Sequence, residues 1–227
     1  MNFSTNTRKI FIFAFLVALS CLSARAEPLS PDEVKTLLAR VREKRATTPN
    51  LQADFQERRK VHLLDEPIAT SGKVWFQAPN KFRRENKGNA PSVTVSDGQQ
   101  LWIYYPKFKS AERYSLAKRS PLDAGVTALT AGLSLQNLES NYHVTGSKEG
   151  DHVILELQPR VPSLRRLLQR LEITLDSDLH VVQTRMLQPN GDEIVTTYAN
   201  HGHAPLPANV FEFTPPAGTD ITTPLGK

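Results

Sequence analysis

The sequence predicts a mainly β protein of the α+β class, in which one strongly curved antiparallel sheet has a few helices on one face. Short segments with alternating apolar and polar residues fill most of the chain after residue 50, which is the pattern of half-buried strands. The dipeptides Asp97-Gly98 and Asn190-Gly191 join such segments, as in tight hairpins. Only two stretches have helical spacing of their apolar residues, so helices are expected to be few.

The N-terminal segment has the features of a secretion signal. Arg8 and Lys9 precede an apolar run, and an A-x-A cleavage pattern ends at Ala26. The apolar run is shorter than the about 20 residues of a membrane span. We therefore expect residues 1–26 to be a cleavable signal peptide and residues 27–227 to form a single exported domain.

Cys21 offers this segment an alternative fate. A cysteine in a signal segment can be the acylation site of a bacterial lipoprotein, but the preceding residues Ala18-Leu19-Ser20 fit that pattern poorly. Cys21 is the only cysteine of the chain. Its removal with the signal would exclude thiol catalysis, CxxC redox chemistry and Cys-based zinc sites.

The charge of the chain gives little support to nucleic-acid binding. The formal net charge is +5, and it falls to +2 when the three basic residues of the signal segment are removed. Nucleic-acid binding requires a concentrated basic surface, so we expect no nucleic-acid partner.

The first helix of the exported part is expected to begin after Ser30. Ser30 is a favourable N-cap, Pro31 occupies the first helical position, and Glu33 completes a capping box. Apolar residues then recur at helical spacing until the polar stretch Thr47–Asn50, where the helix is expected to end.

The strands are predicted from alternation and from the turns that separate them. In chain order they are 51–56, 74–76, 81–86, 92–96, 101–105, 142–145, 153–157, 171–176, 181–188, 193–199 and a last short strand over 211–213.

A second, apolar helix is predicted from Leu122 to Leu133, after the helix-starting pair Ser120-Pro121. Gly125 and Gly132 weaken it by about 1 kcal/mol each relative to alanine. A sheet with one apolar face must cover that face, and two short helices can cover it only partly. This is the first indication of a cavity.

The sequence shows no catalytic motif, since G-x-S-x-G, H-E-x-x-H and a glycine-rich phosphate loop are all lacking. We expect neither enzymatic activity nor a cofactor. His201-Gly202-His203 could place two imidazoles on one strand face, but without an acidic neighbour it is interpreted as a surface loop rather than a metal site. The charged run Glu57–Lys60 is interpreted as a solvated face or docking patch.

Four segments carry a resemblance to a known family. Residues 72–83, GKVWFQAPNKFR, resemble the G-x-x-W/F-x-x-x-P-x-x-F-R signature of LolA, the periplasmic outer-membrane lipoprotein carrier family. Residues 95–104 are similar to its V-S-D-G-x-x-L-W-x-Y segment, 51–57 to its first strand, and 211–218 to its C-terminal F-x-F-x-P-P-x-G. The four segments occur in the family order, which makes the combination specific.

The resemblance implies an unclosed β-barrel with a helical lid over a hydrophobic cavity for acyl chains. Such carriers accept acylated lipoproteins from an inner-membrane ABC transporter, cross the periplasm and deliver them to an outer-membrane receptor, without cofactor or catalytic residues. We expect this chain to act in the same way as a monomer. The residues expected to line its cavity are Phe55, Val74, Phe76 and Phe82 from strands and Leu122, Val126 and Leu129 from the lid.

Two positions depart from the family pattern. Ala78 stands where the family has an arginine thought to hold the lid closed, and Arg84 replaces a common tryptophan. With Ala78, closure would rest on apolar contact alone, which predicts fast hydrogen exchange over residues 121–133 without ligand. The departures leave open a carrier of another periplasmic lipid or a divergent paralogue. Acylation of Cys21 would instead indicate the outer-membrane receptor, which has the same fold.

Overall fold

The computed structural model describes residues 26–116, 135 and 138–224, most of which form strands. The strand bounds are β1 Glu27–Pro28, β2 Asn50–Lys60, β3 Ile68–Gln77, β4 Lys81–Lys87, β5 Ser92–Ser96, β6 Gln100–Tyr105, β7 Ser110–Ser115, β8 Tyr142–Glu149, β9 His152–Pro159, β10 Arg170–Leu175, β11 Val181–Leu187, β12 Glu193–Gly202 and β13 Asp220–Thr222.

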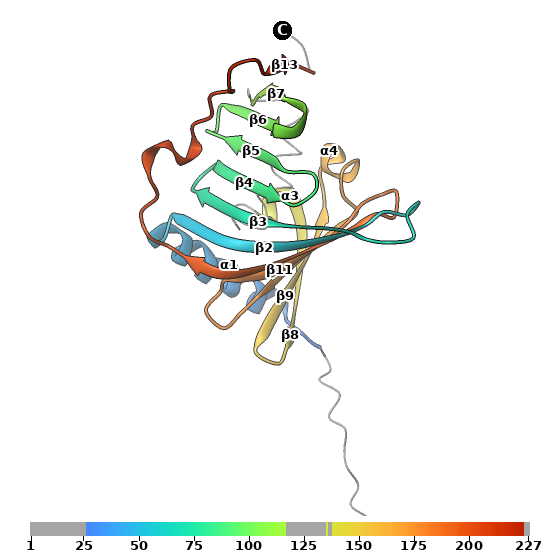
Figure 1. Cartoon of the computed structure of the whole chain (residues 1–227). Coiled ribbons are helices and arrows are strands. Elements are labelled where there is room, and N and C mark those ends of the chain that lie inside the picture. Colours follow the sequence, from blue (N-terminus) through green and yellow to red (C-terminus); the bar gives the residue numbers. More distant parts are fainter. Residues whose placement is uncertain (1–25, 117–134, 136–137, 225–227) are drawn as a thin grey trace, which may run out of the picture.

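These strands form one sheet in the order β1-β8-β9-β10-β11-β12-β2-β3-β4-β5-β6-β7-β13 (Figure 1). Neighbouring strands are antiparallel except β13, which pairs with β7 in parallel. The sheet is not closed, because β1 and β13 are its two edges. The strands turn strongly between the β8–β9 and β3–β6 parts of the sheet (Figure 1). The predicted single, curved, antiparallel sheet is confirmed.

The first helix, α1 (Pro31–Thr47), begins as the sequence predicts. The Ser30 hydroxyl accepts a hydrogen bond from the Glu33 backbone N–H at 3.3 Å. The Glu33 carboxylate in turn accepts one from the Ser30 N–H at 2.7 Å. These two bonds form the capping box and satisfy donors that a helix start leaves open. The predicted helix and its cap are confirmed.

One side of α1 packs against β8–β11, where it covers half of what we call the inner face of the sheet. The buried residues of α1 are the apolar Val34, Leu37, Leu38 and Val41, together with Arg45 near its C-terminal end. The four apolar residues join apolar residues of the strands and of the short helices α3 (Leu138–Asn141) and α4 (Pro162–Arg165). We call this group the helix-covered cluster. Its sheet residues are Tyr142, Leu155, Leu157, Leu171, Ile173, Leu175 and Val181.

The prediction of a last strand over 211–213 is wrong. Residues Ala208–Phe211 form the 3₁₀ helix η2. Phe213 instead stacks against Trp102 and Tyr104, with ring centroids 5.7 and 5.5 Å apart. Its alternation with Phe211 therefore reflects packing of a connecting segment on the outer face of the sheet.

Three strands were not predicted from the sequence: the two-residue β1, which pairs with β8, and β7 and β13. β13 lies after the Pro215-Pro216 pair and adds to the edge of β7. β7 has only one fully buried side chain, Ala111, so it lacks the apolar alternation from which the other strands were predicted.

Several predictions concern residues outside the described ranges. The signal segment is one, since the described residues begin at 26 and β1 starts at Glu27. The helix predicted over Leu122–Leu133 is another. Among the described residues, no helix is long and apolar enough to cross a membrane.

Candidate lipid-binding face

The second half of the inner face, over β2–β7, carries an apolar cluster of its own. Phe55, Val74, Phe76 and Phe82, the four strand residues expected to line a cavity, all belong to it and are each 2–3% exposed. We call this group the β2–β7 cluster, and its further buried members are Leu51, Ala53 and Leu101. The expected lining residues Leu122, Val126 and Leu129 lie outside the described residues. That these side chains bind acyl chains stays a prediction.

Strand register explains why these residues meet. Leu51 pairs with Phe76, Phe76 with Phe82, and Ala53 with Val74. Because alternate residues of a strand point to the same face, residues two positions apart in β2 and β3 join one apolar surface. Trp102 has the opposite parity to Leu101 and lies on the outer face against Phe213. The aromatic run 101–105 thus divides between the two faces.

Gly72 allows the strands to approach closely beside Phe55. A Cβ placed at Gly72 would lie 1.8 Å from the Glu85 carbonyl oxygen and 2.9 Å from the Phe55 ring. No other residue fits there without displacing backbone, so the glycine is needed for the position of the Phe55 ring.

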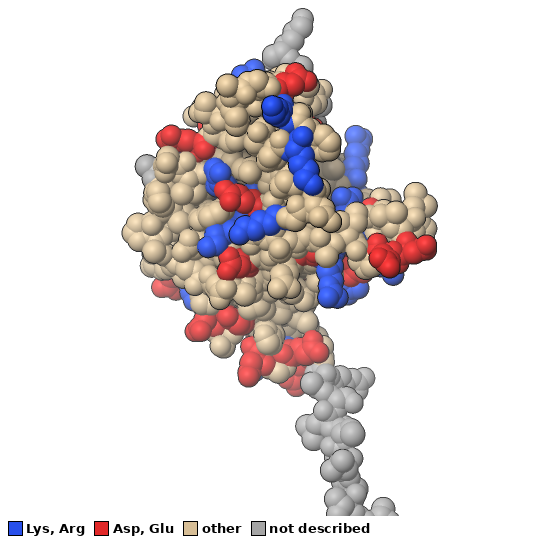
Figure 2. Space-filling view, in the orientation of Figure 1, with Lys and Arg blue, Asp and Glu red and all other residues tan. Residues whose placement is uncertain are grey.

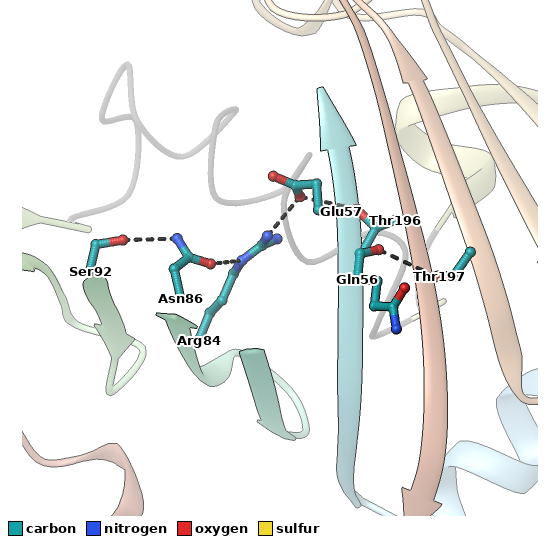
Figure 3. A network of polar contacts seen from close by, with 7 residues as sticks. All are labelled: Gln56, Glu57, Arg84, Asn86, Ser92, Thr196 and Thr197. Atoms are coloured by element: carbon teal, nitrogen blue, oxygen red, sulfur yellow. Dashed lines mark hydrogen bonds and ion pairs between the residues drawn. The ribbon is translucent and has the colours of Figure 1, made fainter. Parts of the chain in front are cut away.

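A charged pair, Arg84 and Glu57, lies on the inner face (Figure 3). Arg84 on β4 donates from Nη2 to the Glu57 carboxylate on β2 at 2.7 Å, and each side chain is 18% exposed. The Arg84 guanidinium also lies over the Phe55 ring, 4.0 Å from its centroid. Such stacking is favourable for arginine. Arg84 therefore joins two strands that are separated by β3.

Further polar groups extend this pair in both directions (Figure 3). Arg84 Nε donates to the Asn86 side chain at 3.0 Å, and Asn86 donates to Ser92 on β5 at 2.8 Å. Thr196 on β12 donates to the same Glu57 oxygen at 3.0 Å. A continuous polar network thus crosses β12, β2, β4 and β5 on the inner face.

Two tyrosines pack against the β2–β7 cluster, and one of them, Tyr198, also lies beside the polar network. Tyr198 packs against both apolar clusters, and burial raises the pKa of its hydroxyl. On β7, Tyr114 donates to the Glu112 carboxylate. Burial, followed by Glu112, raises the pKa of Tyr114 to about 12. Both tyrosines are therefore neutral hydrogen-bonding groups at ordinary pH.

Ala78 packs against the β2–β7 cluster. Its backbone N–H donates to the Pro49 carbonyl at 3.0 Å. Its methyl group offers no side-chain hydrogen bond at the position where the resemblance implies an arginine. What this does to closure concerns residues 121–133, which lie outside the described residues, so the hydrogen-exchange prediction stays open.

The interpretation of His201-Gly202-His203 as a surface loop is wrong. The two histidines are half-buried at the end of β12, and their rings stack on His180, with centroids 5.1 and 5.3 Å away. His201 Nε2 lies 2.9 Å from the Val181 carbonyl, and His203 Nδ1 lies 2.9 Å from that of Asn50. Within the described part of the chain, no three His, Cys, Asp or Glu side chains are placed to share a metal ion.

Glu57 is the residue of this face that the sequence interpretation missed. It belongs to a charged run, but it has the same parity as Ala53 and Phe55 on β2. Only Arg58, Arg59 and Lys60 of that run are exposed. Continuing the alternation by one more step would have placed Glu57 on the inner face.

The described residues thus form one open, curved sheet whose inner face is apolar over β2–β7. The chain belongs to the outer membrane lipoprotein carrier protein LolA family, whose model matches residues 46–214. This is a family of non-enzymatic transport proteins, and the resemblance stated from the sequence is confirmed.

Individual relatives agree with this assignment. The chain is 27% identical to an outer-membrane lipoprotein carrier protein of Alkalilimnicola ehrlichii, with 92% of this chain and 93% of that protein covered. It is 30% identical to one from Nitrosospira multiformis, with 75% and 81% covered. A crystal structure of an uncharacterized conserved protein from Thermus thermophilus has a similar fold, with a TM-score of 0.50, 10% identity, and 84% and 99% covered.

Proposed function

We propose that this chain carries acylated lipoproteins across the periplasm. It would accept them from an inner-membrane ABC transporter and release them to an outer-membrane receptor, after removal of residues 1–26. Membership of the lipoprotein carrier family supports this proposal. The acyl chains would lie against the β2–β7 cluster, and no cofactor or catalytic residue would take part.

The observation that carries the proposal is the apolar inner face of β2–β7. Seven apolar side chains gather there, outside the half of the sheet that α1 covers. Each methylene group moved from water to an apolar site gains about 0.8 kcal/mol, so a chain of about 16 carbons gains on the order of 12 kcal/mol. Binding of this size can compete with a membrane for an acyl chain.

The direct test is recovery of cargo from the periplasm. The exported chain is purified under native conditions, and its bound proteins and lipids are identified by mass spectrometry. We expect acylated lipoproteins to co-purify. Recovery of none, from cells in which the exported chain is folded, would contradict the proposal.

A pair of variants tests the binding face. Phe82→Ala removes an aromatic ring from the β2–β7 cluster, and Trp102→Ala removes one from the outer face. Bound lipoprotein should decrease in the first variant and stay unchanged in the second. Equal recovery from both variants would mean that the cargo binds elsewhere.

Two alternatives remain testable. Arg84 on the inner face favours a carrier of another periplasmic lipid, and the same mass spectrometry distinguishes such a lipid from lipoprotein. The outer-membrane receptor requires an acylated Cys21. Mass analysis of the N-terminus decides this, because a diacylated Cys21 supports the receptor and a free Glu27 supports the carrier.

A further inference from the structure

We propose that the polar network around Arg84 binds the uncharged amide or ester group through which an acyl chain is attached to its cargo. This inference rests on the proposed carrier function and adds to it a defined place for the polar end of the ligand. It follows from the arrangement, the charge and the hydrogen bonds of the inner face.

The inner face changes from apolar to polar along the strands. Leu51, Phe76, Phe82 and Leu101 form one row across neighbouring strands through their register. The second row after this one contains Phe55, Gly72 and Asn86. Arg84 lies in the row between these two, and Glu57 lies one row beyond Phe55 on β2. A ligand with an apolar chain and a polar end can match both parts of this face at once.

The charges of this face disfavour an anionic group. Arg84 is already paired with Glu57, and Arg59, farther along β2, is paired with Asp192. Glu112 on β7 adds another acidic side chain. An anionic head would have to displace Glu57 and would meet an excess of acidic groups. An uncharged carbonyl compound avoids both costs.

The Arg84–Glu57 pair has hydrogen-bonding capacity beyond its own contact. Among the described residues, Arg84 donates from Nε and Nη2, and Glu57 accepts at Oε2. Nη1 can donate to a ligand carbonyl, and Glu57 Oε1 can accept from an amide N–H or a hydroxyl. Both side chains retain 18% exposure. A ligand in which a carbonyl stands next to an N–H or a hydroxyl can therefore accept from Arg84 and donate to Glu57 at the same time.

The experiment is a displacement assay on the exported chain. N-phenyl-1-naphthylamine, an uncharged fluorescent probe, reports occupation of the apolar site. Three competitors share one chain of twelve carbons: N-dodecanoyl-glycinamide carries an amide, 1-monododecanoylglycerol carries an ester, and dodecyl phosphate carries an anion. We expect the amide and the ester to bind roughly tenfold more tightly than the phosphate, the difference of about one hydrogen bond to a charged group.

Variants identify the group responsible. Arg84→Met should weaken binding of the amide and the ester roughly tenfold relative to binding of the probe. Glu57→Gln should strengthen dodecyl phosphate, because it leaves the Arg84 charge available. Arg83→Met is the matched control, since Arg83 pairs with Glu85 and the Val210 carbonyl. It should change none of these affinities. If Arg84→Met does not fold, the double variant Glu57→Leu/Arg84→Met, which leaves no unpaired charge, replaces it.

The outcomes separate this inference from the carrier function. A wild-type chain that binds neither the probe nor any competitor would contradict the carrier function itself. Tight probe binding with a preference for dodecyl phosphate, or equal weakening of all ligands by Arg84→Met, would overturn only the inference. Preference for the amide over the ester supports an acylated protein as the source of the ligand, and the reverse supports an acylglycerol.

Discussion

The two halves of the inner face are built from the same sheet but differ in composition. Under α1, the strands β8–β11 present almost only aliphatic side chains, several with no exposed surface. Over β2–β7, aromatic side chains lie next to a charged pair and its polar neighbours. The first half is a permanent core that α1 completes. In the second half, charged groups at partial burial are costly for stability alone, which is what the binding role proposed above would require of this face.

The largest loss of stability is expected from a substitution in the helix-covered half. Leu157 has no exposed surface, so Leu157→Ala should lower the free energy of unfolding by about 3 kcal/mol through lost burial and a residual cavity. Urea denaturation measures this. Probe affinity should not change, because Leu157 is not part of the β2–β7 cluster. A parallel loss of probe affinity would show that the two halves do not act separately.

A smaller effect is expected from breaking the charged pair. Glu57→Leu leaves Arg84 without its partner, which should cost about 2 kcal/mol in urea denaturation. The double variant Glu57→Leu/Arg84→Leu should recover most of this loss, because two apolar groups replace the pair. If the double variant is less stable than the single one, the pair stabilises the fold and the contrast between the halves is weakened.

The N-cap of α1 is expected to contribute less to the stability of the fold than the charged pair does. Ser30→Ala removes the N-cap hydroxyl, and the expected cost is about 1 kcal/mol. The loss should appear as faster hydrogen exchange in α1 and in the strands it covers, with β2–β6 unaffected. Faster exchange in β2–β6 as well would mean that α1 supports both halves.

The smallest change in stability is expected with pH, at the border between the halves. There His180 stacks on His201 and His203. Burial, then Lys44, lowers the pKa of His180, and Asp176 opposes this shift. The unfolded chain therefore binds a proton more readily than the folded one. Stability should decline as pH falls through the ordinary histidine value of about 6.5.

Urea midpoints between pH 8 and pH 5 measure this decline. His180→Gln should reduce its slope, whereas His143→Gln, at an exposed position of β8, should not. An unchanged slope in His180→Gln would assign the pH dependence to other groups.

The sequence was most informative where structure depends on neighbouring residues. The Ser30 cap and the Asp97-Gly98 turn are local, and the Asp97 side chain accepts from the Gln99 and Gln100 N–H groups as expected of such a turn. The Phe-x-Phe pattern at Phe211 led to the wrong prediction of a strand over 211–213, because a segment packed on the outer face can have the same alternation as a strand.

The candidate site was only partly predictable. Its apolar members follow from strand parity and from the family resemblance. The Glu57–Arg84 contact could not be predicted, because it joins residues 27 positions apart across an intervening strand. The alternation of β2 alone places Glu57 on the inner face, but its partner Arg84 depends on the order and register of the strands.

The two edges of the open sheet have a consequence for behaviour in solution. An unpaired strand edge exposes N–H and C=O groups that can recruit a second sheet and start aggregation. Here the edges are β1, with two residues, and β13, with three. β1 covers Ser147 and Lys148 of β8, and β13 covers Ser110 to Glu112 of β7, and strands this short offer few hydrogen bonds of their own to another chain. Short edges of this kind limit pairing of the unclosed sheet with a second chain, as the proposed carrier function would require.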